Sequence, residues 1–361
     1  MSDKTMAVGL DIGTAFIQCE RDDASGNGTV STTVRDCYSE LPYEEDFEET
    51  LKAQGVHYIR DDKKIYILGE DAFRQAGMSE FSAKDGEEIL KRPMRNGILN
   101  PSSPKTALVI LRAILKACVE KGIGPARKGE IMYFSVPSVP VDSNLDPVFH
   151  GSLCEKFFRD LGYDARPLGE GLAVVFGSNP KQFSKDGPVP FTGIGISHGA
   201  GMVNFCLAER GRPICEFSVV RAGDWVDDRV ALMTGEHKTK VSRVKERRLD
   251  FTKIDQEDPI LVALDVYYTQ LVSYVFGEFA KKFSSNKGFI EDPIEIVLSG
   301  GTASPPGFDA KVKQVLGSMS LPFRVHDVRM AGNGNREDML KTVARGCFIR
   351  AKQAAKKADT K

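Results

Sequence analysis

The sequence lacks the short motifs that most directly reveal an enzyme class. It contains no GxxxxGK(S/T) segment, and no GxGxxG segment follows a strand, which argues against a P-loop and a Rossmann dinucleotide site. No cysteine and histidine lie together in the pattern of a nucleophile with its base. The five histidines are scattered without metal-ligand spacing, so we expect no structural zinc.

Paired cysteines, excess charge and long apolar runs are scarce too. The seven cysteines never form a CxxC pattern and are odd in number, which favours a reduced, cytoplasmic protein. The net charge is −1, so no overall field attracts nucleic acid or an anionic membrane. We see no apolar run long enough to span a bilayer, and the first residues do not resemble a signal peptide. We therefore expect a soluble protein with no membrane segment and no direct nucleic-acid partner.

Strand and helix patterns alternate along the 361 residues, which predicts an α/β fold of about two domains. Residues 39–85 are acidic and predict a loop-rich peripheral subdomain with one hairpin. A helix is expected at Ser102-Ser103-Pro104, where hydroxyl groups would cap its first turn. Strands are predicted at residues 6–12, 15–22, 131–136, 192–198, 202–209, 213–220, 294–301 and 324–329, and long helices at 260–283 and 337–355.

The turn in LDIGTAF, residues 10–16, can approach a ligand closely. Asp11 ends the first strand and can hold magnesium through water, while the amides of Gly13, Thr14 and Ala15 can point at phosphate oxygens. The alternative is an ordinary hairpin in which Asp11 caps the turn. The stretch by itself leaves both interpretations open.

The turn in GIGISHGAGM is a second candidate. Gly199 and Gly201 permit backbone conformations that other residues avoid and allow a ligand to approach the chain. The alternative is a tight turn without a ligand. A carboxylate at its start would hold a metal or a water, but the residue there is Ser197. His198 is either a general base or a bystander at the turn.

Two further segments are candidates, one for its bare backbone and the other for its carboxylate. In SGGTASPPGF, Gly300 and Gly301 end a strand and leave a flat surface on which a planar base can lie, or they simply connect a strand to a helix. In LGEGLAVVFG, Glu170 begins an apolar helix. It either complements the helix dipole or orients an attacking water in a cleft.

The segment KTKVSRVKERR, residues 238–248, is strongly basic. It lacks the interleaved aromatic residues of a surface that stacks nucleic-acid bases, and the chain as a whole is not basic. A solvated helix face is the simpler interpretation.

The order of these segments resembles the actin-like ATPase superfamily. A strand-DxGT-strand unit is followed by a Glu-led apolar helix, strand-GxG-strand, GDxxD, a Lys-Glu helix and SGGT. AGDWVDDRV, VKERRLDF, RPMRNGIL and VARG are similar to segments of bacterial actin homologues such as MamK and MreB. The resemblance covers nearly the whole chain. It implies an actin-like fold, a duplicated ribonuclease H-like architecture in which two lobes, each with a small peripheral subdomain, flank a nucleotide cleft.

The resemblance implies domain boundaries as well. Residues 1–165 with 335–361 would form lobe I, whose peripheral subdomain covers about 35–95. Residues 166–334 would form lobe II, whose peripheral subdomain covers about 236–290.

ATP or ADP with Mg²⁺ is the ligand that the resemblance implies for the cleft. Asp11 would organise the magnesium through water, and Glu170 would position the attacking water. Lys245 and Glu246 would lie at the purine and the ribose. The other residues implied to bind the nucleotide are Gly13, Thr14, Ala15, Phe16, Ser197, Gly199, Ala200, Gly201, Met202, Gly223, Gly300, Gly301 and Thr302.

The chain departs from the family at the second turn, where Ser197 replaces the usual aspartate and removes a negative charge. Gln18 stands where eukaryotic actin has a lysine, which bacterial homologues also lack. We expect a filament-forming cytoskeletal ATPase that assembles with itself, binds Mg-ATP and hydrolyses it slowly. The alternative is a non-polymerising nucleotide-binding scaffold with weak or no hydrolysis. A sugar or acid kinase of the same fold fits less well, because the chain is short for one.

Overall fold

The computed structural model describes residues 5–61, 63–79, 90–178, 182–184, 187–284 and 293–360. Its centre consists of two five-stranded mixed sheets. The first sheet has the order β10-β9-β1-β2-β3, and the second has the order β15-β14-β13-β16-β17. The strands of the first sheet are β1 (Ala7–Ile12), β2 (Phe16–Asp22), β3 (Thr29–Arg35), β9 (Ile131–Val136) and β10 (Asp164–Gly169). Those of the second are β13 (Gly193–His198), β14 (Val203–Glu209), β15 (Arg212–Val219), β16 (Ile294–Ser299) and β17 (Val325–Met330).

The two sheets share one topology. In each sheet, three consecutive strands pair antiparallel, and two later strands then add in parallel beside the first of them. The turn that follows β1 and the turn that follows β13 therefore occupy equivalent places. This internal duplication matches the expected fold class, and all eight strands predicted from the sequence are present.

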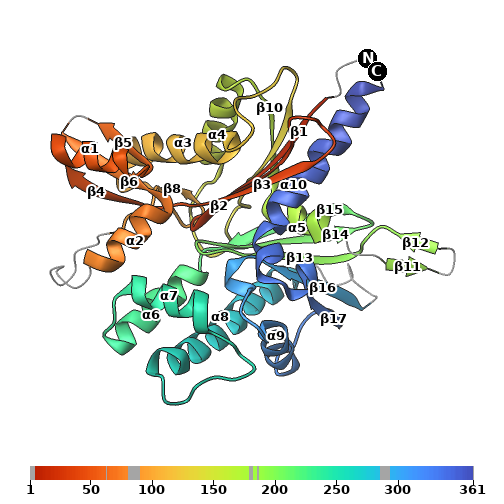
Figure 1. Ribbon diagram of the computed structural model, residues 1–361. Helices are drawn as coiled ribbons and strands as arrows, with labels where there is room; N and C mark the ends of the chain where they lie inside the picture. The colour runs from red at the N-terminus through yellow and green to blue at the C-terminus, as the bar shows by residue number, and fades with distance from the viewer. Residues whose placement is uncertain are drawn as a thin grey trace.

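Two helices connect the sheets. α10 (Arg336–Asp359) packs on β1 and β9 of the first sheet, whereas α5 (Glu170–Ser178) packs on β13 and β14 of the second. The helices also pack on each other between the two sheets (Figure 1). They approach so closely that a Cβ atom added at Gly177 or Gly346 would collide with the backbone carbonyl of Thr342 or Ala173. Only glycine fits at these two positions.

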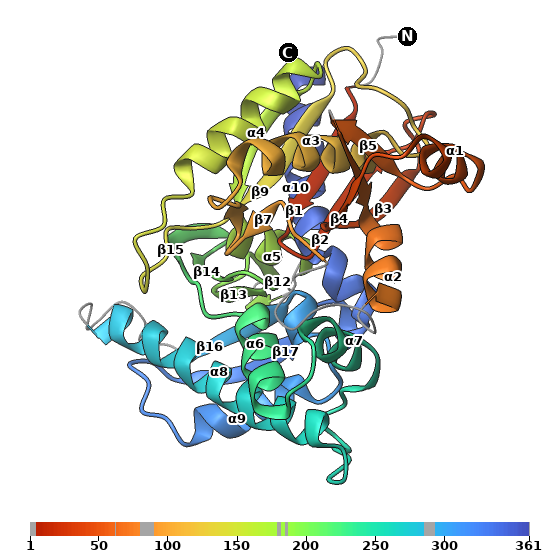
Figure 2. The same cartoon turned by 90° about the vertical axis from the view of Figure 1, so that its left-hand side faces the viewer.

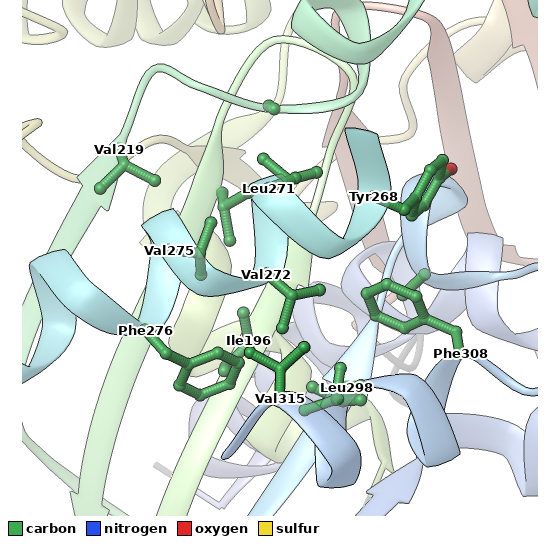
Figure 3. Packing of buried hydrophobic residues seen from close by; sticks show 14 of the residues in the cluster. Ile196, Val219, Tyr268, Leu271, Val272, Val275, Phe276, Leu298, Phe308 and Val315 are labelled. Atoms are coloured by element: carbon green, nitrogen blue, oxygen red, sulfur yellow. The ribbon is translucent and has the colours of Figure 1, made fainter. Parts of the chain in front are cut away.

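The second sheet is covered by α8 (Pro259–Ser284), whose residues interleave with those of the strands (Figure 3). Val272, Val275 and Phe276 are fully buried against Ile196 and Leu298. Contrary to our expectation from the sequence, one stretch of the described chain, Pro259–Phe283, is long and apolar enough to cross a membrane. Because one face of this helix is buried against the second sheet, it is the core helix of this part of the molecule. The other helices here are α6 (Gly223–Thr234), α7 (Lys238–Arg248) and α9 (Phe308–Gly317).

The peripheral part beside the first sheet was expected to be loop-rich with one hairpin. The hairpin is confirmed, but the expectation of loops around it is wrong for the described residues. The peripheral part contains a three-stranded sheet, β4 (Tyr38–Pro42), β6 (Lys64–Leu68) and β5 (Tyr58–Asp61), with α1 (Glu45–Ala53) and α2 (Gly69–Ser79). Leu51, Ile65, Ile67 and Phe73 give it a small core of its own. Three of the acidic residues that suggested loops, Glu45, Asp46 and Glu48, lie in the first turn of α1, where they complement the helix dipole. Part of the expected segment, residues 80–85, lies outside the described residues.

The first sheet is covered by α3 (Pro104–Glu120) and α4 (Val148–Asp160), as Figure 2 shows. Ser103 occupies the N-cap position of α3, but its side chain makes no capping hydrogen bond, so the predicted hydroxyl cap is wrong. A short hairpin precedes this helix, and Asn96 and Gly97 form its turn with positive φ angles of 49° and 72°, as a two-residue hairpin turn requires. The hairpin strands are β7 (Met94–Arg95) and β8 (Ile98–Leu99), and a second short hairpin consists of β11 (Gln182–Ser184) and β12 (Gly187–Val189).

We use "first half" for the first sheet with α1 to α4 and the peripheral sheet, and "second half" for the second sheet with α6 to α9. Figures 1 and 2 show the first half above the second, with α5 and α10 between them.

Candidate functional site

A pocket lies between the two halves, and segments far apart in the sequence converge on it. Seventeen residues were expected to contact the nucleotide or its magnesium, and all of them except Gly223 line this pocket. They are Asp11, Gly13, Thr14, Ala15, Phe16, Glu170, Ser197, Gly199, Ala200, Gly201, Met202, Lys245, Glu246, Gly300, Gly301 and Thr302. Gly223 lies just behind the lining, where its amide donates to the Gly199 carbonyl at 3.2 Å and its carbonyl accepts from the Lys245 ammonium at 3.3 Å.

The first turn presents bare backbone to the pocket. The Gly13 amide donates to the Phe16 carbonyl at 3.1 Å, and a Cβ atom at Gly13 would lie 2.6 Å from the same carbonyl oxygen. The Thr14 hydroxyl accepts a hydrogen bond from the Gly97 amide at 3.1 Å. The turn is therefore closed by its own backbone and braced by the hairpin between β7 and β8.

The second turn repeats this construction. The Gly199 amide donates to the Met202 carbonyl at 2.9 Å, and a Cβ atom at Gly199 would lie 2.7 Å from that oxygen. A Cβ atom at Gly201 would lie 2.7 Å from the Gly97 amide nitrogen. Both turns thus meet around Gly97, one from each half, and their residues line the pocket between them. Backbone amides in such turns can form a favourable site for anionic oxygens.

Two carboxylates line the pocket, that of the half-buried Asp11 and that of the buried Glu170. Asp11 accepts a hydrogen bond from the Ser135 hydroxyl at 2.8 Å, and Glu170 accepts one from the Ser197 hydroxyl at 3.2 Å. Burial raises the pKa of Asp11, and burial together with the charge of Asp11 raises the pKa of Glu170. A divalent cation between such groups would offset both effects. Beside them the buried Gln18 Oε1 has no protein partner.

A magnesium ion fits this donor set only with help from water and ligand oxygens. Among the described residues, no three side chains of His, Cys, Asp or Glu cluster closely enough to hold a metal. Mg²⁺ typically keeps several waters and binds through one or two carboxylates plus substrate phosphates, which is what Asp11 and the two turns can provide.

Asn204 is a site residue that the sequence did not single out. It lies opposite Ser197 across the β13–β14 hairpin and is fully buried. Its Oδ1 accepts a hydrogen bond from the Ser138 amide at 2.9 Å, which fixes the orientation of the side-chain amide. The Asn204 Nδ2 has no hydrogen-bond partner of good geometry. The Asn204 side-chain amide nevertheless lies near Glu170 and lowers its pKa, which partly offsets the effect of burial.

Residues of α7 line another part of the pocket. The Lys245 ammonium lies 2.6 Å from Asp227 Oδ1, so its charge is already paired. Glu246 receives two hydrogen bonds from Arg35 of the first half, at 3.1 and 3.0 Å. Burial would raise the pKa of Glu246, but Arg35 brings it below its ordinary value. Gly300, with a φ of 96°, packs on the His198 backbone and lines the pocket together with Gly301.

His198 is a bystander. Its ring is fully buried and packs edge-on against Phe308 at 5.2 Å between centroids. Burial lowers the pKa of His198 to about 3, so it stays neutral at ordinary pH. The pocket lining does not include it.

Cationic and acidic residues outside the expected set complete the pocket. Arg92 donates to both oxygens of Asp224 at 2.7 and 2.9 Å and so connects the two halves. Arg336 enters from the first turn of α10. The segments RPMRNGIL and AGDWVDDRV signalled the places of Arg92 and Asp224 in the sequence, but neither segment reveals that these two side chains pair.

Solved structures with the same fold are actin-like proteins. The chain is similar to a MamK double helical filament, with 18% identity, a TM-score of 0.65 and coverage of 96% of this chain and 99% of the other. It is similar to MreB5 of Spiroplasma citri bound to AMPPNP, with 16% identity, a TM-score of 0.62 and coverage of 99% and 98%. It is also similar to the ethanolamine utilization protein EutJ from Carboxydothermus hydrogenoformans, with 14% identity, a TM-score of 0.53 and coverage of 96% of this chain and 90% of the other. None of the curated proteins matches the chain significantly.

The duplicated sheets, the cleft and these likenesses define a protein of the actin-like ATPase fold, as the sequence resemblance implied. The profile of one family, Volactin, matches residues 6–351, so the chain belongs to the Volactin family.

Proposed function

We propose that the chain binds an adenine nucleotide, ATP or ADP, with Mg²⁺ in the pocket between its halves, which act as lobes I and II with the boundaries given above. The observation that carries this proposal is the convergence of sixteen expected residues from separate segments on one pocket. MreB5, which shares the fold, has been solved bound to AMPPNP.

We assign the pocket residues different roles according to their positions. Backbone amides of the two glycine turns would hold the phosphates, and Gly300, Gly301 and Thr302 would support the adenosine. Asp11 would hold magnesium through water, and magnesium, when bound, supplies charge neutralisation at the phosphate oxygens. Glu170 would orient and deprotonate the attacking water from its position beside Ser197. The expected reaction is slow hydrolysis of ATP to ADP and phosphate.

Self-assembly into a filament is the cellular role that fits this chemistry. The MamK structure of the same fold is a double helical filament. ATP would hold the halves together and favour head-to-tail contacts between subunits, and hydrolysis would weaken them. A head-to-tail contact that does not close into a ring gives a filament. We place the assembly in the cytoplasm.

Electron microscopy of the purified protein with Mg-ATP, with Mg-ADP and without nucleotide tests the assembly, together with high-speed pelleting. Filaments that form with ATP and shorten as phosphate is released are the expected result. Protein that stays in the supernatant under all three conditions at high concentration would contradict assembly, and it would leave nucleotide binding to be judged separately.

A non-polymerising nucleotide-binding scaffold is the second candidate, and Ser197 favours it because a neutral hydroxyl stands beside Glu170. Ser197→Asp tests how much this matters. If the missing charge limits hydrolysis, the variant should bind Mg²⁺ more tightly and turn over faster at saturating Mg-ATP. An unchanged rate would show that another group has taken the place of the missing carboxylate.

A further inference from the structure

Arg35, at the end of β3, is held in an unusually specific environment. Its guanidinium lies over the ring of Phe16 at 4.5 Å and over the ring of Phe73 at 3.8 Å. Its Nε donates to Glu70 at 3.0 Å, while its two terminal nitrogens donate to the two oxygens of Glu246. Two aromatic rings, two carboxylates and the planar fork of the guanidinium therefore fix one geometry, which a lysine cannot reproduce.

The bond between Arg35 and Glu246 crosses the cleft. Arg35 and Phe16 belong to the first half, and Phe16 lines the pocket beside the first glycine turn. Glu246 belongs to α7 of the second half and lines the pocket as well. The side chains of Arg35 and Glu246 are only 10% and 18% exposed, so solvent screens their interaction less than it would screen a surface pair.

A neighbouring contact joins the same two halves. Arg243, one turn before Glu246 on α7, donates to the Phe73 carbonyl at 3.1 Å, and its guanidinium lies 5.0 Å from the centre of the Phe73 ring. Phe73 of α2 is thus contacted by Arg35 from its own half and by Arg243 from the other half. Breaking the Arg35–Glu246 pair would loosen α7 from the peripheral part of the first half.

We propose that Arg35 is a positioning residue of the nucleotide pocket: it orients the Glu246 carboxylate for the sugar hydroxyls of the nucleotide and latches the two halves, so that release of nucleotide requires this pair to open. The inference rests on the proposed nucleotide binding. Each carboxylate oxygen can accept more than one hydrogen bond, so a ribose hydroxyl can donate to Glu246 while Arg35 remains bonded to it. A sugar bound there completes the latch without replacing it.

Release of radiolabelled ATP into an excess of unlabelled ATP, with Mg²⁺ present, tests the latch. We expect Arg35→Gln to release ATP about tenfold faster than the wild type, because a charged pair with little exposure is lost. Arg35→Lys should fall between the two, since it keeps the charge but loses the fork. In a Glu246→Gln background, Arg35→Gln should add less than twofold, because both substitutions remove the same interaction.

A matched control is available in Arg60, which also lies over an aromatic ring, that of Tyr43 at 3.8 Å, and pairs with Glu48 at 3.6 Å. It does not cross the cleft, so Arg60→Gln should leave ATP release unchanged. Thermal melting of each variant shows whether it is folded, and Arg35→Lys carries the test if Arg35→Gln does not fold.

A second measurement separates positioning from general loosening. The wild type should bind ATP more tightly than 2′,3′-dideoxyATP, and this preference should shrink several-fold in both Arg35 variants. Wild-type protein that binds ATP while Arg35→Lys and Arg35→Gln match it in release rate and sugar preference would overturn the inference and leave the proposed function intact. Wild-type protein that takes up no ATP would instead overturn the proposed function.

Discussion

Glu170 is the side chain on which the proposed hydrolysis depends most directly. It is buried at the start of α5, bonded to Ser197 and close enough to Asp11 for the two charges to interact. We expect Glu170→Gln to lower the rate of phosphate release by about 10²–10⁴-fold, because the amide keeps the shape but cannot accept a proton. Affinity for Mg-ATP should change by less than about threefold, which equilibrium binding checks.

Glu209→Gln serves as the control for this variant, since Glu209 lies exposed at the far end of β14. Its turnover should equal that of the wild type. If Glu170→Gln loses nucleotide binding in proportion to turnover, Glu170 holds the pocket together and does not act on the attacking water.

Two buried histidines make the fold sensitive to acid. Burial lowers the pKa of His150 to about 4 and that of His198 to about 3, below their ordinary value of 6.5. Below pH 6.5 the two histidines therefore bind protons in the unfolded chain but stay neutral in the folded chain. Their contribution to the free energy of unfolding is fully present above pH 6.5 and decreases as the pH falls toward the folded pKa values. Between pH 7 and 5 each histidine should cost about 2 kcal/mol of unfolding free energy.

Urea unfolding at both pH values measures this loss. His198→Phe and His150→Gln should each reduce the difference between pH 7 and pH 5 by about the contribution of one histidine, whatever their effect on stability at pH 7. Variants that keep the wild-type difference would show that other groups cause the acid sensitivity.

At the scale of elements, the two central sheets are joined by the close packing of α5 against α10. A Cβ atom at Gly346 would collide with the Ala173 carbonyl, whereas one at Gly277 in the middle of α8 would meet no atom within 4 Å. Gly346→Ala should therefore lower the unfolding free energy by about 1–3 kcal/mol through overpacking. Gly277→Ala should raise it by up to about 1 kcal/mol, because alanine is the better helix former.

Chemical denaturation of these two alanine variants compares the same substitution in two helices. Equal effects would mean that the helix crossing can relax, and the tight glycine contact would then not determine how the sheets are joined.

Helices and strands with a regular hydrophobic pattern and a clear boundary could be predicted from the sequence. Elements that lack such a pattern or boundary could not. The apolar strand 131–136 ends at Pro137, and the 260–283 helix is long and regular, so both were found within two residues. In the peripheral sheet, β5 and β6 were predicted as a hairpin. The strand β4 and the helices α1 and α2 were missed because acidic residues around a small core, such as Leu51 and Ile65, resemble a solvated loop. The cap at Ser103 failed because cap preference names a residue type, while the hydrogen bond depends on the rotamer.

At the scale of the whole molecule, the backbone of the site was predictable and its cross-cleft pairs were not. Glycine turns signal their position locally, so Gly13 and Gly199 could be placed by pattern and resemblance. Arg35 and Glu246 lie 211 residues apart, and Arg92 and Asp224 lie 132 apart. Neither arginine stands in a motif that names its partner, because the pairing arises only when the two halves face each other.

Titration calorimetry of Mg-ATP into the purified wild-type chain and into Asp11→Ala tests the central claim, that the two glycine turns hold one nucleotide between the halves. We predict uptake of one ATP per wild-type chain, and clearly weaker uptake by Asp11→Ala in the presence of Mg²⁺. Wild-type protein that takes up neither ATP nor ADP with magnesium present would contradict the claim.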